Sequence, residues 1–462
     1  MRIGARITLF LGKSLGFASR LSGAGGGTTL PGRAARRLYP RFVREMVAGL
    51  PRGCALVTGT NGKTTTSTLI ASILESAGVA TAHNRTGANL MAGIASALIR
   101  ESDLSGRLGA GLGLFEVDEA ALPAAVDETV PRLVLVNNLF RDQLDRYGEL
   151  DTLASRMRGA IETLGPGATV VLNADDPLVA SIGRDLPQRV LYFGIDTDRY
   201  ASPSMQHAAD SKHCSSCGSR LHYDYYLFGH LGRYSCPSCG LARPEADVAA
   251  TGIDMSGMEG TRCTVRYPGG TAEVYMPLPG LYNVYNALAA FACAQALGVE
   301  VDTITRATGG FTAAFGRVEK VEADGRSIMM ILAKNPAGLN EVMRTLSGEA
   351  GKKEVVLALN DNIADGRDVS WIWDVDLEML RGHLGNVVCS GIRAWDMGLR
   401  VKYAELDEES LFCEQDLEAA LDRGLSRVPP GGTLYVVPTY TAMLDLRKIM
   451  VKRGLVTPYW EG

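Results

Sequence analysis

The sequence predicts an α/β fold with a central domain on a parallel sheet, a small cysteine-rich insertion in that domain, and a second α/β domain at the C-terminus. From Cys54 onward, short runs of Val and Leu alternate with helical segments. These runs lack polar alternation, which indicates strands buried on both faces of a helix-covered parallel sheet. A second alternating set begins near residue 316. We expect a helical segment at residues 1–50, the central domain at 51–315 and the second domain at 316–462.

Composition excludes several classes of protein. The net charge of −4 over 462 residues supplies no basic excess for a general binder of nucleic acid or anionic membranes. Nine cysteines, an odd number, argue against a secreted chain with every cysteine in a disulfide. No apolar run approaches the ~20 residues that a membrane-spanning helix needs. We expect a cytoplasmic protein, with the inner face of the cell membrane as the alternative place.

The N-terminal segment is predicted to be helical. Met1–Leu21 has apolar residues around Ile7–Leu11, but Lys13 interrupts the run too early for a signal peptide. We favour a surface helix that packs on the body of the protein over a helix that lies on a membrane surface. The polar side of the membrane alternative would hold Arg2, Arg6, Lys13 and Arg20. The basic residues that follow, predicted to form a solvated face, are Arg33, Arg36, Arg37 and Arg41.

The first strand–helix junction has the composition of a phosphate-binding loop. Residues 58–66 read TGTNGKTTT between a strand at Cys54–Val57 and a helix at Thr65–Ala77. The glycines let backbone N–H groups turn onto phosphate oxygens, and the helix N-terminus adds partial positive charge. Lys63 is expected to reach the β- and γ-phosphates of ATP, and the Thr64 hydroxyl to ligate Mg²⁺. Because Val57 replaces the usual first glycine, an ordinary glycine-rich turn is the alternative. The nucleotide-binding residues predicted here are Gly59, Thr60, Asn61, Gly62, Lys63, Thr64 and Thr65.

Polar side chains end two neighbouring strands of the predicted sheet. Glu116 ends the strand Leu112–Val117, and Asn137 ends Leu133–Asn137. The carboxyl ends of parallel strands share one edge, so both should lie beside the phosphate loop. Glu116 is expected to hold Mg²⁺ together with Thr64, and Asp118 competes for that role. A solvated acid at a strand end is the alternative.

Four cysteines predict a structural zinc site. Two CxxCG knuckles, Cys214–Gly218 and Cys236–Gly240, flank a segment that reads as a hairpin. Each knuckle directs two thiolates at one point, so the pair supplies the tetrahedral sulfur set of a zinc ribbon, at about residues 211–245. With all four positions filled by protein, the metal would stabilise the fold without catalysing. The predicted zinc ligands are Cys214, Cys217, Cys236 and Cys239.

Two later segments add polar groups. Asn283 and Asn286 lie three apart at the start of a helix that runs to about Leu297; Asn283 is a candidate cap, whereas Asn286 needs another partner. In the second domain, residues 359–374 (LNDNIADGRDVSWIWD) follow a predicted buried strand. A loop rich in acids and tryptophans at the carboxyl end of a strand is typical of a binding or catalytic segment; an acidic turn with two core tryptophans is the alternative.

These motifs together resemble the Mur ligase superfamily, whose phosphate loop has the TGTNGKT form without the first glycine. Within it the chain is most similar to the MurT branch, the ligase-like subunits of lipid II isoglutaminyl synthases. The zinc ribbon and the acidic loop separate that branch from other Mur ligases. Further motifs that carry the resemblance are Leu30-Pro-Gly, His83-Asn84, Asn138 to Asp151, Asn173 to Pro177, Asn283-Val-Tyr-Asn286 and Ala333 to Gly338.

The resemblance implies an activity and a partner. It implies ATP-dependent amidation of the D-glutamate α-carboxylate in the lipid II stem peptide, through an acyl phosphate that ammonia attacks to give D-isoglutamine. It assigns Asn286 to the nucleotide, makes Arg317 a candidate phosphate contact, and gives Lys63 and Glu116 catalytic roles. Ammonia would come from a separate glutaminase subunit, GatD, and the membrane would be met only through the lipid-linked substrate. It also suggests that an acid of the second domain orients the partner's catalytic His; Asp368 is the first choice, before Asp365 and Asp361.

Two other functions remain open from the sequence. A Mur or folylpolyglutamate-type ligase would add an amino acid in place of ammonia, although Lys334 stands where many such ligases have His. A zinc-ribbon adaptor for nucleic acid with an ATPase switch is disfavoured by the balanced charge around the ribbon.

Overall fold

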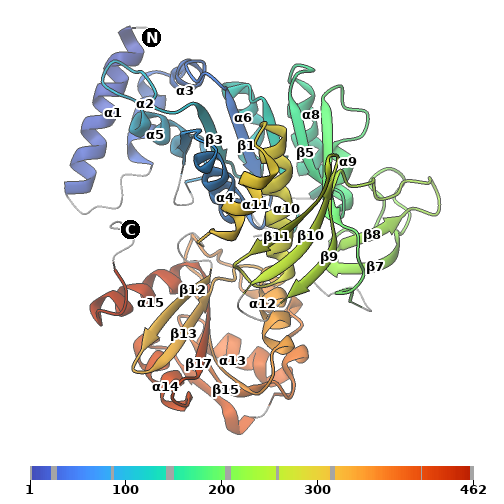
Figure 1. The fold of residues 1–462 in the computed structure, drawn as a ribbon. Helices are drawn as coiled ribbons and strands as arrows, with labels where there is room; N and C mark the ends of the chain where they lie inside the picture. Colours follow the sequence, from blue (N-terminus) through green and yellow to red (C-terminus); the bar gives the residue numbers. More distant parts are fainter. Residues whose placement is uncertain are drawn as a thin grey trace.

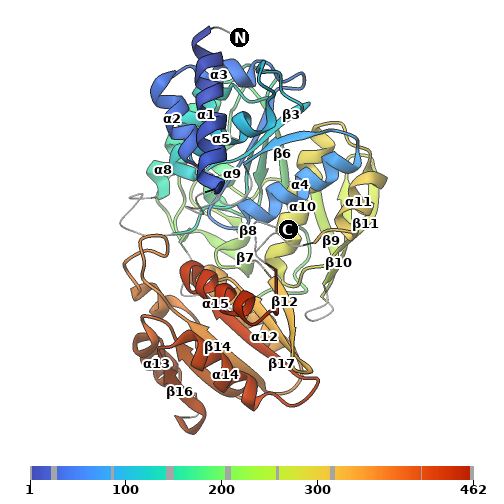
Figure 2. The same ribbon diagram turned by 90° about the vertical axis from the view of Figure 1, so that its left-hand side faces the viewer.

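Two α/β sheets lie one beyond the other, and a small two-stranded hairpin stands beside the first (Figure 1). The view turned by 90° shows that the second sheet and the helices on its faces are separate from the first sheet (Figure 2). This computed structural model describes residues 3–21, 29–84, 88–141, 150–202, 210–255, 260–312, 318–406 and 408–457. Among these residues, no helix has the length and apolar character needed to cross a membrane.

The first sheet has nine strands in the order β11-β10-β9-β6-β5-β4-β1-β3-β2. Every neighbouring pair from β2 to β9 in that order is parallel, and β10 and β11 extend the sheet as an antiparallel edge. This confirms the predicted parallel sheet. The strands are β1 (Cys54–Thr58), β2 (Thr81–His83), β3 (Leu112–Glu116), β4 (Leu133–Val136), β5 (Thr169–Asn173), β6 (Arg189–Ile195), β9 (Val248–Met255), β10 (Thr261–Tyr267) and β11 (Gly270–Met276).

Helices cover both faces of this sheet. Successive residues of β1 alternate between two cores, with Ala55 and Val57 in one and Cys54 and Leu56 in the other. The first core is closed by α4 (Lys63–Ser76), α10 (Leu281–Ala296) and α11 (Val301–Gly309). Helices of the second core are α1 (Ile3–Leu21), α2 (Leu30–Leu38), α3 (Phe42–Val47), α5 (Met91–Glu101), α6 (Leu122–Thr129), α8 (Leu150–Glu162) and α9 (Pro177–Ile182), with the short 3-10 helix η1 (Glu119–Ala121) nearby.

The cysteine-rich insertion is the crossover between two adjacent strands. Parallel neighbours β6 and β9 need a long connection, and the hairpin of β7 (His222–Phe228) and β8 (Leu231–Ser235) forms part of it. Leu221, Tyr223 and Tyr234 of the insertion pack with Ala180 of α9. The insertion therefore has a small apolar core that is continuous with the side of the central domain.

The second sheet has the order β12-β13-β17-β14-β15-β16, with only the β12–β13 pair antiparallel. Its strands are β12 (Val318–Ala323), β13 (Arg326–Ile331), β14 (Lys353–Ala358), β15 (Leu384–Ser390), β16 (Leu411–Glu414) and β17 (Thr433–Pro438). Two helices cover each face. The helical elements are α12 (Pro336–Gly348), α13 (Ala394–Tyr403), α14 (Leu417–Arg427), α15 (Tyr440–Lys452), η2 (Ser370–Asp374), η3 (Leu377–Leu380) and η4 (Glu408–Ser410).

The structure differs from the predictions in a few elements. The apolar pattern of Val375–Leu380 predicts a helix, and this prediction is wrong, because Val375 is extended and only the one-turn 3-10 helix η3 follows Asp376. The proposed capping role of Asn283 is also wrong, since Gly280 occupies the N-cap of α10 and Asn283 donates to the Pro279 carbonyl. Helices α6, α11 and α13 and strands β9, β12 and β16 had not been predicted. The predicted boundary at 315/316 lies outside the described residues.

Candidate active site

The phosphate loop lies where it was predicted, between β1 and α4. Gly59 and Gly62 both have positive φ, 125° and 82°. A Cβ on Gly62 would stand 2.0 Å from the Asn286 Oδ1, and one on Gly59 2.9 Å from the Asn138 nitrogen. Only glycine fits at these two positions, for backbone conformation and for space. The loop is therefore a tight cradle with a helix N-terminus at its end, as an anion site requires.

Asparagines from the end of β4 and from helix α10 fix the loop. Asn138 accepts from the Asn61 N–H at 2.8 Å and donates to the Asn61 carbonyl at 3.1 Å. Asn137 donates to the Thr66 hydroxyl at 3.0 Å, and that hydroxyl donates to Asn286 at 3.2 Å. Asn286, for which the sequence indicated no partner, thus contacts the loop, although 220 positions separate it from Thr66. Among the described residues, the buried Asn61 Nδ2 and Asn137 Oδ1 have no partner, so polar groups remain for a ligand.

Lys63 forms a buried ion pair that the sequence analysis missed. Its Nζ lies 3.0 Å from Glu119 Oε2 and donates to the Gly59 carbonyl at 2.5 Å. The two side chains are 8% and 5% exposed. Burial raises the pKa of Glu119, but the charge of Lys63, a backbone hydrogen bond and the charge of Lys334 together leave that pKa below its ordinary value. The lysine is therefore held as a cation at the mouth of the loop.

Glu116 stands one strand away from the loop, as predicted. Strand pairing sets Glu116 opposite Val57 and Val136 opposite Thr58, so the three strand ends share one edge. Glu116 is buried, and its backbone is clamped by Asn84 through two hydrogen bonds of 2.8 Å. No hydrogen bond joins its carboxylate to another described side chain. The competing acid, Asp118, instead accepts from the Ala120 N–H as the N-cap of η1. A buried carboxylate at the sheet edge where the phosphate loop begins fits a hard cation such as Mg²⁺.

A cavity of about 680 Å³ opens from the phosphate loop toward the second sheet. Its walls come from the loop, from the start of α10 and from the C-terminal domain. The lining residues that bear on a ligand are Asn61, Gly62, Thr65, Asn138, Tyr282 and Asn286. The Asn335 amide donates to Asn61 Oδ1 at 2.9 Å, so a residue of the second domain touches the loop directly. Arg317, the other candidate phosphate contact, lies outside the described residues.

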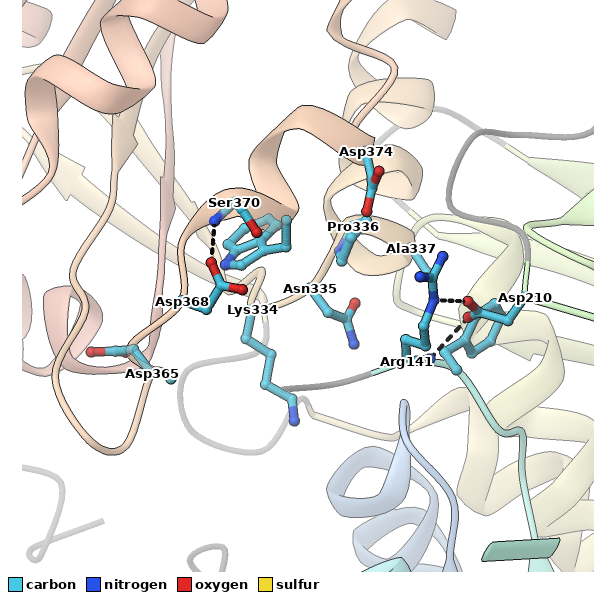
Figure 3. A pocket seen from close by; sticks show the side chains of 13 residues that line it. Arg141, Asp210, Lys334, Asn335, Pro336, Ala337, Asp365, Asp368, Ser370 and Asp374 are labelled. Atoms are coloured by element: carbon cyan, nitrogen blue, oxygen red, sulfur yellow. Dashed lines mark hydrogen bonds and ion pairs between the residues drawn. The ribbon is translucent and has the colours of Figure 1, made fainter. Parts of the chain in front are cut away.

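A second cavity, of about 670 Å³, lies between the acidic loop and the central domain. Figure 3 shows Lys334 extending into it from the second domain, with Asp368 and Ser370 on the same side and Arg141 with Asp210 opposite. Arg141 is paired with Asp210. Asn335 lines this cavity and donates to Asn61, which lines the first, so the two cavities are neighbours.

The three candidate acids of the acidic loop have different environments. Asp361 pairs with Arg393 at 2.8 Å. Asp365 is buried, accepts from the Thr441 N–H at 2.8 Å, and has its pKa raised by burial. Asp368 is exposed and accepts from the Ser370 N–H at 2.8 Å, which lowers its pKa. Asp361 and Asp365 therefore hold the loop in place, and Asp368 presents an ionised carboxylate to its surroundings.

The four cysteines of the insertion converge. Their sulfur atoms all lie within 4.8 Å of one another. Cys214 and Cys239 are 3.6 Å apart, and Cys217 and Cys236 are 3.5 Å apart. Zinc bound to four thiolates at about 2.3 Å places the sulfurs about 3.8 Å apart, so the donor set fits that metal. The predicted hairpin between the knuckles is also present.

The tip of the insertion's hairpin supports the phosphate loop. Phe140 exchanges two hydrogen bonds with the Thr60 hydroxyl, of 3.0 and 3.1 Å, through its backbone. Its ring packs against those of Phe228 and His230, with centroids 5.0 and 4.5 Å away. His230 is fully buried, 3.4 Å from Asp176. The insertion is thus connected to the nucleotide cradle by one aromatic side chain.

Comparison with known proteins decides the family. A model described as the Mur ligase middle domain matches residues 57–294, and one described as the MurT ligase C-terminal domain matches residues 332–443. A curated relative from Staphylococcus aureus, named as lipid II isoglutaminyl synthase (glutamine-hydrolyzing) subunit MurT, is 33% identical over 91% of this chain and 92% of its own. The chain belongs to the MurT family of the Mur ligase superfamily. The MurT protein of Streptococcus pneumoniae is 32% identical over 99% of both chains.

A solved structure confirms that the MurT-family chain has a Mur ligase fold. A pseudomurein peptide ligase type C from Methanothermus fervidus aligns with a TM-score of 0.67 over 90% of this chain and 81% of that one. At 22% identity this likeness shows the fold alone. The family and the fold class predicted from the motifs are therefore confirmed, including the cysteine cluster and the second α/β domain.

Proposed function

We propose that this MurT-family chain is the ATP-dependent synthase subunit that amidates the D-glutamate α-carboxylate of the lipid II stem peptide. The observation that carries the proposal is the match of the whole chain, second domain included, to curated MurT subunits. The reaction has two steps: the carboxylate takes the γ-phosphoryl group of ATP to become an acyl phosphate, and ammonia then displaces phosphate. Activation is needed because a carboxylate has no leaving group until one of its oxygens is phosphorylated.

The chain's residues can serve the first step. The positive-φ glycines of the loop turn N–H groups toward phosphate oxygens, and Lys63 brings a fixed positive charge. Glu116 and the Thr64 hydroxyl would hold Mg²⁺, which neutralises the charge that develops between the phosphates. Asn286 would contact the nucleotide, because it closes the cavity over Gly62.

The second cavity suits the acceptor. Lys334 faces it and also contributes to the electrostatic field at Glu119, so its positive charge acts both in this cavity and at the Lys63–Glu119 pair. An anionic carboxylate would be drawn there and held next to the phosphate loop. Because the second cavity lies beside the acidic loop, ammonia could reach the carboxylate there from the side of the C-terminal domain.

Ammonia would come from a glutaminase partner, because no cysteine outside the insertion has the environment of a glutaminase nucleophile. Burial raises the pKa of Cys54, Cys263 and Cys293 to about 12, which keeps these thiols protonated. Cys413, whose pKa is lowered to about 7 by the Cys389 thiol, lines neither cavity. The relative's name includes glutamine hydrolysis and calls it a subunit. We assign to Asp368 the orientation of the partner's catalytic His, as the third member of a triad.

Zinc would hold the insertion together. The four thiolates leave no open coordination position for a substrate, so its contribution is to folding. Through Phe140 that contribution extends to the shape of the phosphate loop.

Reconstitution tests the proposal. Purified chain, ATP, Mg²⁺ and a lipid II analogue are incubated with ammonium, or with glutamine in the presence and absence of the glutaminase subunit. We expect a mass loss of about 1 Da in the peptide in which NH₂ replaces OH, with glutamine used only when the partner is present. Incorporation of a whole amino acid would instead establish a Mur or folylpolyglutamate-type ligase. ATP hydrolysis without any change in the peptide would contradict both.

A further inference from the structure

Helix α1 packs by one narrow face and turns the other to solvent. Its buried residues, Ala5, Thr8, Leu9 and Gly12, lie on one side of the helix, and α1 contacts α2, α3 and α5. A Cβ on Gly12 would stand 2.7 Å from the Ile99 side chain, so the helix sits as closely on α5 as a glycine allows. The predicted surface helix is thereby present, and its orientation on the body is fixed.

The outward face of α1 is apolar. Ile7, Phe10 and Phe17 are 58%, 61% and 62% exposed, and Leu11 is 40% exposed. Spacings of three and seven put Ile7, Phe10 and Phe17 on one side of a helix, with Leu11 one turn beyond Ile7. A soluble surface helix normally places charged residues there. Figure 2 shows α1 in front of α2 and α5, and none of the described chain covers it.

Positive charge lies beside this apolar face, although Arg36 and Arg44 are paired with Glu128 and Asp127. The first 44 residues contain nine Lys and Arg and no Asp or Glu, whereas the whole chain has a net charge of −4. The remaining residues, 45–462, therefore carry −13, so the overall balance conceals a strongly basic N-terminal segment. Arg6 on α1 and Arg33 and Arg37 on the neighbouring α2 are exposed. Two leucines at the ends of α2, Leu30 and Leu38, are also exposed, at 50% and 59%.

We propose that the outward face of α1, with the basic residues of α2, docks on an anionic lipid bilayer. An amphipathic helix with aromatic residues on its apolar side and Arg or Lys at its flanks lies in the headgroup region with the apolar side chains inserted. Each basic residue near an anionic surface adds attraction that salt screens. A second copy of the chain is a poorer occupant, because it would bring the same positive charge to the interface.

This docking would serve the proposed function, on which its biological purpose rests. The substrate proposed above is carried on a membrane lipid, so an enzyme held at the bilayer surface searches in two dimensions for it. The binding itself is independent of catalysis, because neither cavity is lined by a residue of α1 or α2.

Vesicle sedimentation tests the proposal. Full-length chain is mixed with vesicles of phosphatidylglycerol and phosphatidylcholine, or of phosphatidylcholine alone, with no substrate lipid. We expect binding to the anionic vesicles that weakens about tenfold when NaCl rises from 50 to 500 mM. The double variant Phe10→Ser/Phe17→Ser should bind at least about tenfold more weakly. Its matched control is Ile363→Ser/Trp395→Ser, which removes two exposed apolar side chains of the second domain, 81% and 66% exposed, and should bind like the wild type.

Each outcome bears on the proposal. Failure of the wild type to sediment with anionic vesicles at low salt, or equal binding by the Phe10/Phe17 variant, overturns it. A concentration-dependent dimer that the same variant abolishes would show that a second copy covers the face, and also overturns it. Turnover of a water-soluble substrate analogue with ammonium separates this proposal from the proposed function: we expect the double variant to retain it. Vesicle binding without any turnover would leave docking intact and refute the function.

Discussion

The buried pair of Lys63 and Glu119 gives the sharpest quantitative prediction. In Glu119→Gln the lysine keeps its carbonyl acceptors but loses its counter-ion inside the protein. Removing one partner of a buried ion pair costs about 3–5 kcal/mol, and the retained acceptors place this case at the lower end, about 3 kcal/mol. For a domain of this size, that corresponds to a fall of about 5–6 °C in the melting temperature of the central domain.

Thermal melting of the ligand-free protein at pH 7 measures this loss. The matched control is Glu162→Gln, which removes the partner of Arg158 in an exposed i,i+4 pair. That change should alter stability by no more than about 0.5 kcal/mol, because such pairs are screened by water. A Glu119→Gln protein as stable as the control would refute the view that Glu119 holds Lys63 as a buried cation.

The pH dependence supplies a second check. The folded-state pKa of Glu119 lies below its ordinary value of 4.5, so folding favours the ionised carboxylate. Its contribution is present in full above about pH 4.5 and is lost as pH falls through the folded-state pKa. The difference in melting temperature between wild type and Glu119→Gln should therefore be constant from pH 6 to 8 and shrink below pH 4.5. A difference that grows on acidification would contradict the direction of the shift.

Three further predictions concern the cradle, the acidic loop and the insertion. Gly62→Ala should abolish ATP binding measured by calorimetry, because the added Cβ would meet Asn286. The control is Gly78→Ala, at a similar φ of 74° with open space around it. That change should cost only about 1 kcal/mol of stability and leave ATP binding intact. Asp368→Asn should abolish glutamine-dependent amidation and largely spare the ammonium-dependent reaction; equal loss of both would refute its role toward the partner. Treatment with a chelator, or the variant Cys214→Ser, should remove about one zinc per chain, as measured by metal analysis. The melting temperature should fall before catalysis fails. A folded variant that loses only ATP hydrolysis would contradict a structural metal.

Local patterns were enough to predict most of the fold. Strands such as β1 and β5 are short apolar runs bounded by turns. Because these runs are apolar throughout, their composition indicates that the strands are buried on both faces. The sequence also predicted α4 and the hairpin between the two cysteine knuckles. Helices α6 and α13 were missed because they are short and begin without a side-chain cap, so no local signal marks their start.

The site residues also include some that the sequence identified and one that it missed. The glycines of the phosphate loop and the four cysteines are recognisable because their spacing alone prescribes a backbone shape or a ligand set. Glu119 was missed for the opposite reason. Its neighbour Asp118 has equal claim in the sequence, and only the path of η1 turns one carboxylate to Lys63 and leaves the other as a cap.

The sequence by itself determined most of the elements, the family and the residue types of the site, since each depends on a pattern within a few tens of residues. Tertiary structure alone decided which groups meet: Asn286 with Thr66, Asn335 with Asn61, and Asp368 exposed while Asp361 and Asp365 are engaged. It also decided that the apolar face of α1 points outward. These choices depend on sheet order and domain packing, which are set by burial over the whole chain and leave no local trace in the sequence.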